Sequence, residues 1–445
     1  MLQLAIRSVR KRPGRFVGTL LATFLGAAIS MAFNSLHDTA GAAGIDDTSA
    51  ETLGLSAGVV GGYGTLLVFF AVASTLTVNV RQRASEITLL RQSGATPAQV
   101  KRMIMGEAVL VAVLGTALAI GPAMLGGRLL LDMFQETDQV APGVDHVFGP
   151  IALSAGFGVT LLASAGAAFL AVRRATRTAA GARAPRARLR TAGGVLALLG
   201  GAGGVAATYA IDPAEPGLMA APAYGAILLS VGFATLSGGL LRTLLRLFGR
   251  PIAALTGAGG YLAVHNTRRR AASLAGVLMT LVLFTGITIA TICIQVVESD
   301  AIEAAGVGKS VEDKNVETLN LVVVGIIAAF CCVMLVNSLY AATSYRRHEF
   351  GGQRLAGATP RQVLTMVATE SGLLAVIGLF FGTVAGLAGA LAFADVRLEA
   401  GLPGETVLIW LGTAAIAVTA TMATSLLTAR RALRTPAIQA VAVAA

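Results

Sequence analysis

The sequence predicts an all-α integral membrane protein with ten transmembrane helices, arranged as two four-helix units and a central two-helix hairpin. Three observations lead to this prediction: the composition, the alternation of charge between apolar runs, and an internal repeat. With 55% hydrophobic residues, 13% charged residues and a mean hydropathy of +0.75, the chain of 445 residues has too few charges to cover a soluble globule of its size.

Ten apolar stretches are long enough to cross the hydrocarbon core of a bilayer, which takes about 20 helical residues. The spans are predicted at residues 16–33, 57–80, 107–126, 150–172, 192–210, 222–241, 272–297, 320–342, 370–394 and 406–428.

The segments between these spans alternate in charge. Of the 34 basic residues, 30 lie in residues 1–15, 81–104, 173–190, 242–270, 346–361 and 430–434, whereas the intervening loops hold 19 of the 23 acidic residues. Under the positive-inside rule the basic segments, and both termini, are predicted to be cytoplasmic. The net charge is +11, and the arginines that contribute to it lie at the ends of predicted spans, where they can reach anionic lipid headgroups. We therefore expect the lipid bilayer, and not a nucleic acid, as a partner.

Cofactor and metal sites are not expected. The three cysteines (Cys293, Cys331 and Cys332) lie within apolar spans, where they are predicted to be small hydrophobic residues. The four histidines are scattered over different loops without ligand spacing. Residues 303–310 end like a Walker A loop but begin with Glu303 where the first glycine belongs, so the chain is predicted not to be an enzyme.

The chain contains a tandem repeat with an offset of 263 residues. Residues 91–100 (RQSGATPAQV) return as 354–363 (RLAGATPRQV), and seven of the ten positions are identical. The units are predicted at 1–180 and 258–445, with a linker and hairpin at 181–257 that serves as spacer, brace or lipid-facing wall. Because each unit holds four spans, both copies share one orientation, and a pseudo-twofold axis along the membrane normal relates them.

In each copy the repeated segment predicts a helix, a sharp corner and a second helix. A left-handed glycine ends the first helix, and a capping box with proline at the first helical position begins the second. We call these segments elbow 1 (residues 83–100) and elbow 2 (residues 346–363). The candidate site residues are Arg83, Glu86, Arg91, Gly94, Thr96, Pro97 and Gln99 in elbow 1, and Arg346, Glu349, Arg354, Gly357, Thr359, Pro360 and Gln362 in elbow 2.

The four acidic residues on the predicted cytoplasmic side have two interpretations. Glu86 and Glu349 are candidates for pairing with cations on a partner, whereas Glu107 and Glu370, near the start of a span, are candidates for structural ties to Arg102 or a helix N-terminus. A simpler alternative is that both elbows are only well-capped loops between spans. The same residue types in both copies favour a functional role.

The segments resemble the FtsX-like permease domain of the MacB, LolC and BceB class of ABC transporters. The resemblance rests on a span ending in basic residues and Glu, the Gly-Ala-Thr-Pro-x-Gln-Val corner, a Glu entering the next span, and an Arg-Arg-x-x-Arg tail at 430–434. It covers both units. It implies a bacterial inner-membrane permease whose elbows are coupling helices seated on two copies of a separate cytoplasmic ATPase subunit, a homodimer similar to that of MacB or LolD.

This resemblance implies export or extraction of a lipophilic or amphipathic substrate. Members of that class carry a large extracytoplasmic domain, whereas the corresponding loops here, 34–56 and 298–319, are short and acidic. A second hypothesis is a mechanotransmission protein that regulates an extracytoplasmic cell-wall enzyme or sensor without transport. A third, an ATPase-independent secondary transporter, is disfavoured because ionisable residues are lacking in mid-membrane.

Overall fold

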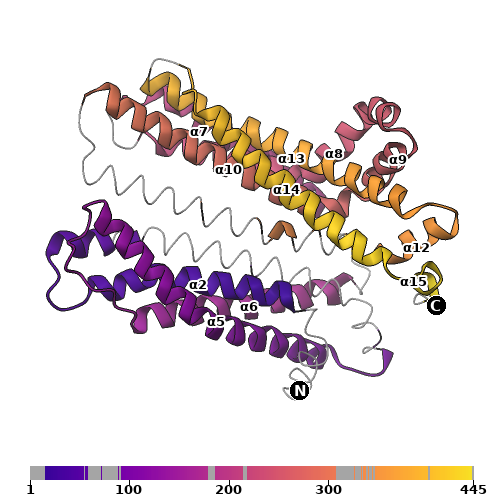
Figure 1. Ribbon diagram of the computed structural model, residues 1–445, viewed down its shortest axis with the longest axis horizontal. Coiled ribbons are helices and arrows are strands. Elements are labelled where there is room, and N and C mark those ends of the chain that lie inside the picture. The colour runs from indigo at the N-terminus through magenta and orange to yellow at the C-terminus, as the bar shows by residue number, and fades with distance from the viewer. Residues whose placement is uncertain are drawn as a thin grey trace. The chain divides into compact units, whose positions relative to one another are not determined.

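The computed structural model describes residues 16–54, 56–58, 92–178, 186–213, 218–306, 346–398 and 401–442, together with isolated positions such as Leu89, Leu339 and Thr343. All the elements in these ranges are helices (Figure 1). They fall into two compact units: α2, α5 and α6 belong to the first, whereas α7 to α10 and α12 to α15 belong to the second.

The first unit is a bundle of α2 (Val17–Ala40), α5 (Pro97–Glu136) and α6 (Pro150–Thr178). The helices pack closely because α5 carries glycine where α2 carries small hydroxyl side chains: a Cβ at Gly115 would lie 2.3 Å from Thr23 Oγ1. Asp38 at the end of α2 accepts hydrogen bonds from the backbone N–H groups of Ile151 and Ala152, and so caps the start of α6.

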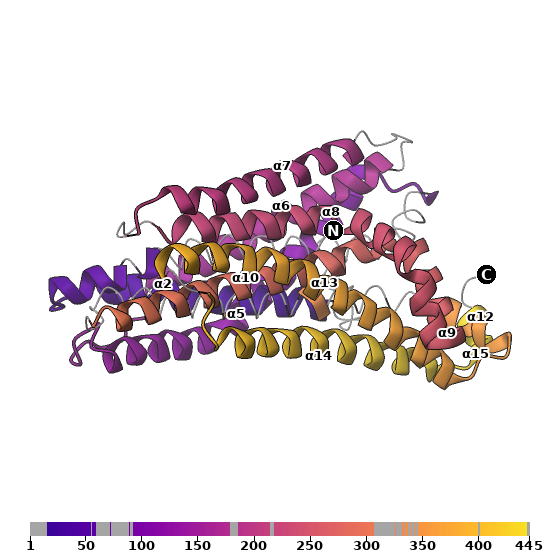
Figure 2. The ribbon, with the colours of Figure 1, turned by 90° about the horizontal axis from the view of Figure 1, so that it is seen from above.

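The second unit begins with the hairpin α7 (Arg186–Ala207) and α8 (Ala220–Leu247), joined through the short 3₁₀ helix η2 (Thr208–Ala210). It continues with α9 (Gly249–Arg269), α10 (Ala271–Ala304) and α12 (Arg347–Leu355). The last helices are α13 (Pro360–Arg397), α14 (Thr406–Leu433) and α15 (Ala437–Ala442), and α14 runs beside α13 (Figure 2).

Seven described helices are long and apolar enough to span a membrane: Gly18–Ala40, Ala98–Glu136, Arg190–Ala210, Ala220–Leu247, Leu274–Ala304, Pro360–Arg397 and Thr406–Leu433. They coincide with seven of the ten predicted spans. The predicted span 150–172 lies in α6, whose apolar part is the shorter stretch Pro150–Gly166. The predicted spans 57–80 and 320–342 lie almost entirely outside the described residues, so the count of ten stays a prediction.

The hairpin is a packed part of the second unit, held against α10 and α13 by close contacts at glycine. A Cβ at Gly389 on α13 would lie 2.6 Å from the Pro222 carbonyl oxygen of α8, and one at Gly286 on α10 would lie 2.2 Å from Ser230 Oγ of α8. Gly382 on α13 and Gly286 on α10 approach each other in the same way. These glycines therefore serve close helix packing, the usual arrangement in membrane bundles.

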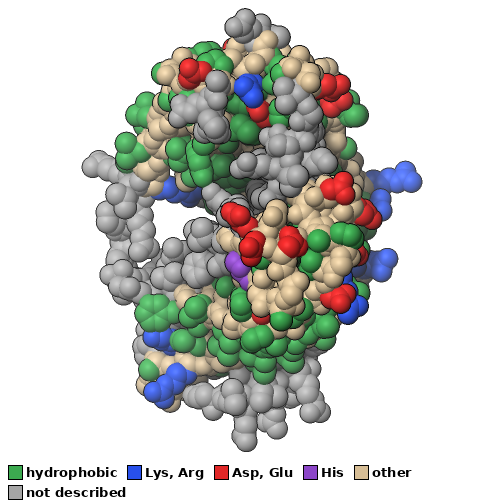
Figure 3. Space-filling view, turned by 90° about the vertical axis from the view of Figure 1, so that its left-hand side faces the viewer, with side chains coloured by type: hydrophobic (Ala, Val, Ile, Leu, Met, Phe, Trp, Pro, Cys, Tyr) green, Lys and Arg blue, Asp and Glu red, His purple; other side chains and the backbone are tan. Residues whose placement is uncertain are grey.

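The hairpin is also tied to this unit at the end opposite α12. Arg397 at the end of α13 donates two hydrogen bonds to Glu298 of α10, at 2.9 and 2.8 Å, and a third, at 2.8 Å, to the Pro213 carbonyl in the hairpin loop. Tyr209 donates to the carboxylate of Asp395, at 3.0 Å. Seen from this end, acidic side chains gather over the loops (Figure 3), in agreement with the acidic loops of the sequence.

Because Gly389 touches backbone of α8, a larger side chain there should separate the hairpin from α13. We expect Gly389→Val to destabilise the second unit by about 1–3 kcal/mol, the usual cost of overpacking. The matched control is Gly372→Val on the same helix, where a Cβ meets nothing within 4 Å. Thermal unfolding in detergent measures both variants, and equal melting temperatures for the two would contradict the packing described.

Candidate coupling elbows

Both predicted capping boxes are present, with nearly identical geometry. In elbow 1 the backbone N–H of Gln99 donates to Thr96 Oγ1 at 3.3 Å, and that of Thr96 donates to Gln99 Oε1 at 2.9 Å. In elbow 2 the corresponding distances between Gln362 and Thr359 are 3.3 and 2.8 Å. Each box satisfies two backbone N–H groups that would otherwise lack partners at a helix start, and Pro97 and Pro360 need none there.

The glycine corners are also as predicted. Gly94 and Gly357 have φ angles of +95° and +97°, in the left-handed region that side chains with a Cβ rarely adopt. In elbow 2 the Ala358 N–H donates to the Gln353 carbonyl and the Gly357 N–H to the Arg354 carbonyl, which is the Schellman pattern of a helix C-terminus. A Cβ at either glycine meets nothing within 4 Å, so the requirement for glycine comes from the backbone alone.

The second helix of each elbow continues without a break into a membrane span. α5 has 40 residues and α13 has 38, about twice the length that a bilayer requires. At 1.5 Å per residue each is about 60 Å long. The capped corner and the far end of the span are therefore two ends of one helix, so a displacement of the corner along the helix axis moves the span with it.

A buried ion-pair network fixes elbow 2 to this helix. Arg346 is 4% exposed and donates hydrogen bonds to Glu349 in α12, at 2.9 and 3.1 Å, and to both carboxylate oxygens of Glu370 in α13. Arg270, where α9 meets α10, reaches Glu349 at 3.4 Å. The network thus joins the elbow, the span that follows it and the start of α10.

The charge of Glu349 is satisfied inside the second unit. Burial alone would raise the pKa of Glu349, but hydrogen bonds and positive charge from Arg346, together with the charge of Arg270, hold that pKa below its ordinary value. Glu349 therefore stays ionised, and its carboxylate is occupied by neighbours of its own unit. This arrangement favours a structural role for Glu349 over the predicted pairing with cations on a partner.

Apolar packing and a second arginine complete the attachment of elbow 2. Phe350 of α12 is 1% exposed and packs in a cluster with residues of α9, α13 and α14. Arg354 donates to the carbonyl oxygens of Leu433 and Thr435, at 3.2 and 2.8 Å, and so satisfies acceptors at the C-terminus of α14. Elbow 2 is consequently held by several helices of its unit and not by one.

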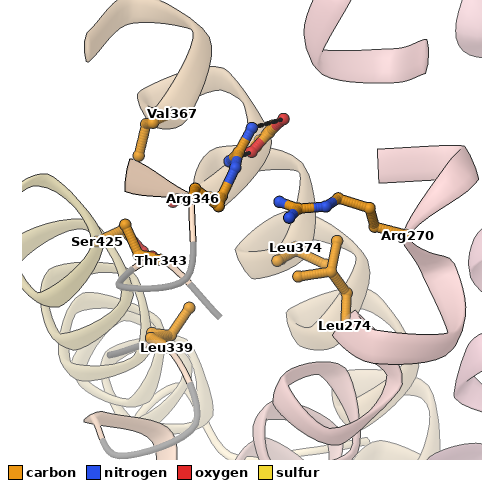
Figure 4. A pocket seen from close by; sticks show the side chains of 10 residues that line it. Arg270, Leu274, Leu339, Thr343, Arg346, Val367, Leu374 and Ser425 are labelled. Carbon is orange, nitrogen blue, oxygen red and sulfur yellow. Dashed lines mark hydrogen bonds and ion pairs between the residues drawn. The ribbon is translucent and has the colours of Figure 1, made fainter. Parts of the chain in front are cut away.

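A small cavity of about 20 Å³ lies beside the network, lined by Arg270, Arg346 and Glu370 as well as hydroxyl and leucine side chains (Figure 4). It has room for a single water molecule. Within the described residues, no group of three or more histidine, cysteine or acidic side chains has the arrangement of a metal site.

The structure leaves part of elbow 1 undescribed. Arg83, Glu86 and Arg91 lie outside the described residues, whereas Gly94, Thr96, Pro97 and Gln99 occupy the predicted corner. Glu107, the counterpart of Glu370, is 2% exposed in α5. In sequence, three members of the elbow 2 network have a counterpart of the same residue type 263 residues earlier: Arg83 for Arg346, Glu86 for Glu349 and Glu107 for Glu370.

A comparison with protein families identifies the class of the chain. The family described as FtsX-like permease C-terminal matches residues 58–180 and 321–437, which together make up more than half of the sequence. The chain therefore belongs to the FtsX-like permease family, as the sequence resemblance implied. The two matches start 263 residues apart, the same offset as the repeat, so the chain carries two FtsX-like regions. Among curated proteins none matches the chain.

The capping boxes offer a local test of the corner. Replacing Thr359 by alanine removes the acceptor for the Gln362 N–H, and we expect a loss of about 1 kcal/mol in the free energy of unfolding, as for other N-cap threonines. Thr359→Ser keeps the hydroxyl acceptor and should stay close to wild type. Chemical denaturation of the purified protein in detergent compares the two variants, and a serine variant as unstable as the alanine variant would contradict this role for the hydroxyl.

Proposed function

We propose that this protein is the permease subunit of an ABC transporter and that separate cytoplasmic ATPase subunits act on it through elbows 1 and 2. ATP-driven motion of those subunits is transmitted to the spans, and a lipophilic or amphipathic substrate is exported or extracted from the outer leaflet. The proposal places the chain in the inner membrane of a bacterium, with both termini and both elbows on the cytoplasmic side. Two ATPase subunits, one for each elbow, match the duplication of the chain.

One observation above all supports this proposal: buried ion pairs attach elbow 2 to the helix that continues into the following predicted span. Arg346 connects Glu349 in α12 to Glu370 in α13, and α13 itself runs from the corner across the predicted membrane span. A loop that only connects two spans has no need for a buried ion-pair network, because removing a charge from water costs several kcal/mol unless it is fully paired. A joint that transmits force does require such rigidity.

The experiment is reconstitution of the chain in lipid nanodiscs with the ABC ATPase subunit that copurifies with it from its native cells. A transport subunit should stimulate ATP hydrolysis by that ATPase, and a lipophilic or amphipathic substrate should raise the rate further. A stable complex whose hydrolysis responds to no substrate but does respond to an extracytoplasmic cell-wall enzyme would instead show mechanotransmission. A fully active chain without any ATPase would overturn the proposal.

A further inference from the structure

The connection between α8 and α10 carries a dense cluster of positive charge. Residues 242–270, which we call the basic connector, contain six arginines and no aspartate or glutamate. Arg270 is engaged, because it reaches Glu349 at 3.4 Å. The other five arginines are exposed, and none of them forms a salt bridge with another described residue: Arg242, Arg246, Arg250, Arg268 and Arg269. Exposed cations without an acidic neighbour favour an anionic ligand from outside the chain.

Both ends of α9 lie at one surface of the predicted membrane. α8 is apolar up to Leu247 and the apolar part of α10 starts at Leu274, so these consecutive spans meet the same side of a bilayer. Only Phe248 separates α9 from α8, and only Arg270 separates it from α10. The two ends of α9 are therefore held at the level of the lipid headgroups.

Aromatic and aliphatic side chains lie exposed among the arginines. Leu247 and Phe248 are 67% and 55% exposed, and Tyr261 and Leu262 in α9 are 63% and 44% exposed. The Tyr261 ring stacks on that of His265, with 6.3 Å between the ring centroids. Arginines interspersed with such side chains are typical of segments at a bilayer surface, where apolar groups enter the acyl region and guanidinium groups bind phosphate. A soluble anion or a nucleic acid offers no apolar phase to them.

The opposite face of α9 packs on elbow 2. Ala263 is fully buried in a cluster with Phe350 of α12 and with residues of α13. α9 and α12 lie at the same end of the second unit (Figures 1 and 2). Arg268 and Arg269 follow five and six residues after Ala263, which places them on the other side of the helix. One side of α9 thus supports elbow 2, and the other side carries exposed cations.

We propose that the basic connector binds anionic phospholipid in the cytoplasmic leaflet, and that the bound lipid stabilises elbow 2. The exposed arginines pair with headgroup phosphates, while Phe248 and Tyr261 enter the acyl region. Because Arg268 and Arg269 directly precede Arg270, lipid held there restricts the helix end from which Arg270 reaches Glu349. The proposal requires that this side of the chain faces an anionic leaflet, and it requires no ATPase.

Lipid binding is measured by native mass spectrometry of the purified chain in neutral detergent, titrated with phosphatidylglycerol. Arg268→Gln/Arg269→Gln should weaken binding at least tenfold, because each arginine near an anionic lipid surface contributes roughly fivefold. The matched control is Arg361→Gln/Arg434→Gln, which removes the same charge at exposed arginines farther from the ends of the predicted spans. The control should bind like wild type. Equal binding by wild type and the connector variant, or an equal loss in the control, would overturn the site.

Two further ligands define the chemistry of the site. Phosphatidylcholine with the same acyl chains should bind about tenfold more weakly than phosphatidylglycerol, because its headgroup has no net charge. Soluble glycerol phosphate in excess should not displace the lipid, because it has no acyl chains. Equal affinity for the two lipids would overturn the selectivity for anionic lipid, and displacement by glycerol phosphate would show a site for free phosphate instead.

Hydrogen–deuterium exchange of α12 in lipid nanodiscs tests the effect on elbow 2. Equal parts of phosphatidylglycerol and phosphatidylcholine should slow amide exchange in residues 347–355 of wild type about threefold relative to phosphatidylcholine alone. Arg268→Gln/Arg269→Gln should show no such difference, although its melting temperature in phosphatidylcholine alone should match that of wild type. Unchanged exchange in wild type that binds the lipid would overturn the effect on elbow 2.

A protein partner at the basic connector would give a different result. In that case Arg268→Gln/Arg269→Gln would lose binding of the ATPase subunit in nanodiscs of neutral lipid while its affinity for phosphatidylglycerol stayed that of wild type, and the lipid proposal would be overturned. The lipid measurements include no ATPase. A chain that works without an ATPase would therefore end the proposed function and leave the lipid site standing, whereas a chain indifferent to anionic lipid would do the reverse.

Discussion

Replacing Arg346 by alanine is expected to destabilise the second unit by about 3–5 kcal/mol, because it leaves the buried carboxylate of Glu370 without its cation. The loss should appear as a lower melting temperature in detergent. A variant that retains the fold should bind the ATPase but stimulate hydrolysis poorly, since α12 is no longer tied to α13.

A double substitution separates the network from simple loss of packing. Arg346→Met/Glu370→Leu removes both charges together and fills much of the same volume, so it should be clearly less destabilising than the sum of Arg346→Met and Glu370→Leu. Residues in one ion-pair network typically show coupling free energies of about 0.5–3 kcal/mol. Strictly additive single effects would contradict the description of Arg346 and Glu370 as a buried pair.

The second large effect is expected at the two corners. In Gly94→Val/Gly357→Val, a β-branched residue must adopt a left-handed backbone that costs roughly 1–2 kcal/mol even for an ordinary side chain. The corners should open instead, so the angle between the two helices of each elbow changes. ATP hydrolysis should continue without driving transport, and membrane insertion should be unaffected.

The corner prediction has two controls. Gly352→Val changes a glycine in α12 that also faces open space but has no positive φ, so it costs only helix propensity. Gly94→Asn/Gly357→Asn places a residue that tolerates the left-handed region, and it should restore coupling. Full coupling in the double valine variant, or an asparagine variant as impaired as valine, would show that the corner geometry is not what transmits the motion.

The sequence predicted the corners well because their determinants are local. A capping box needs residues three positions apart, and a left-handed glycine follows directly from the end of a helix, so short-range spacing specifies both. Apolar length also located seven helices that the structure shows to be long and apolar enough to span a membrane.

The buried network could not be derived from sequence in the same way. Arg346 and Glu370 are 24 residues apart, and they meet only because the corner turns α12 back against α13. The sequence showed that both residue types recur in the two copies, but it connected Glu370 to a helix terminus or to an arginine like Arg102. Retention of an arginine and two glutamates at fixed offsets was the signal that could have indicated one ion-pair network.

The position of the hairpin within the second unit could also not be derived from the sequence. Close helix packing depends here on glycine, and glycine carries no side chain that would identify its partner in the sequence. Only the fold shows that Gly389 contacts α8 and that Arg397 reaches the hairpin loop, which makes the hairpin a brace of the second unit. Among spacer, brace and lipid-facing wall, this arrangement favours the brace.

The proposed function depends above all on elbows that lie in the cytoplasm and contact an ATPase. The most direct measurement places a single cysteine at Ala356, an exposed residue at the corner of elbow 2, in a chain whose native cysteines are replaced by alanine. This cysteine is then labelled with a membrane-impermeant maleimide. Ala141→Cys in an acidic loop is the control. We expect labelling of position 356 in inside-out vesicles only, with protection by the bound ATPase subunit, and labelling of position 141 in intact cells only. Labelling of position 356 from outside intact cells would contradict the proposed orientation and, with it, the coupling role of the elbows.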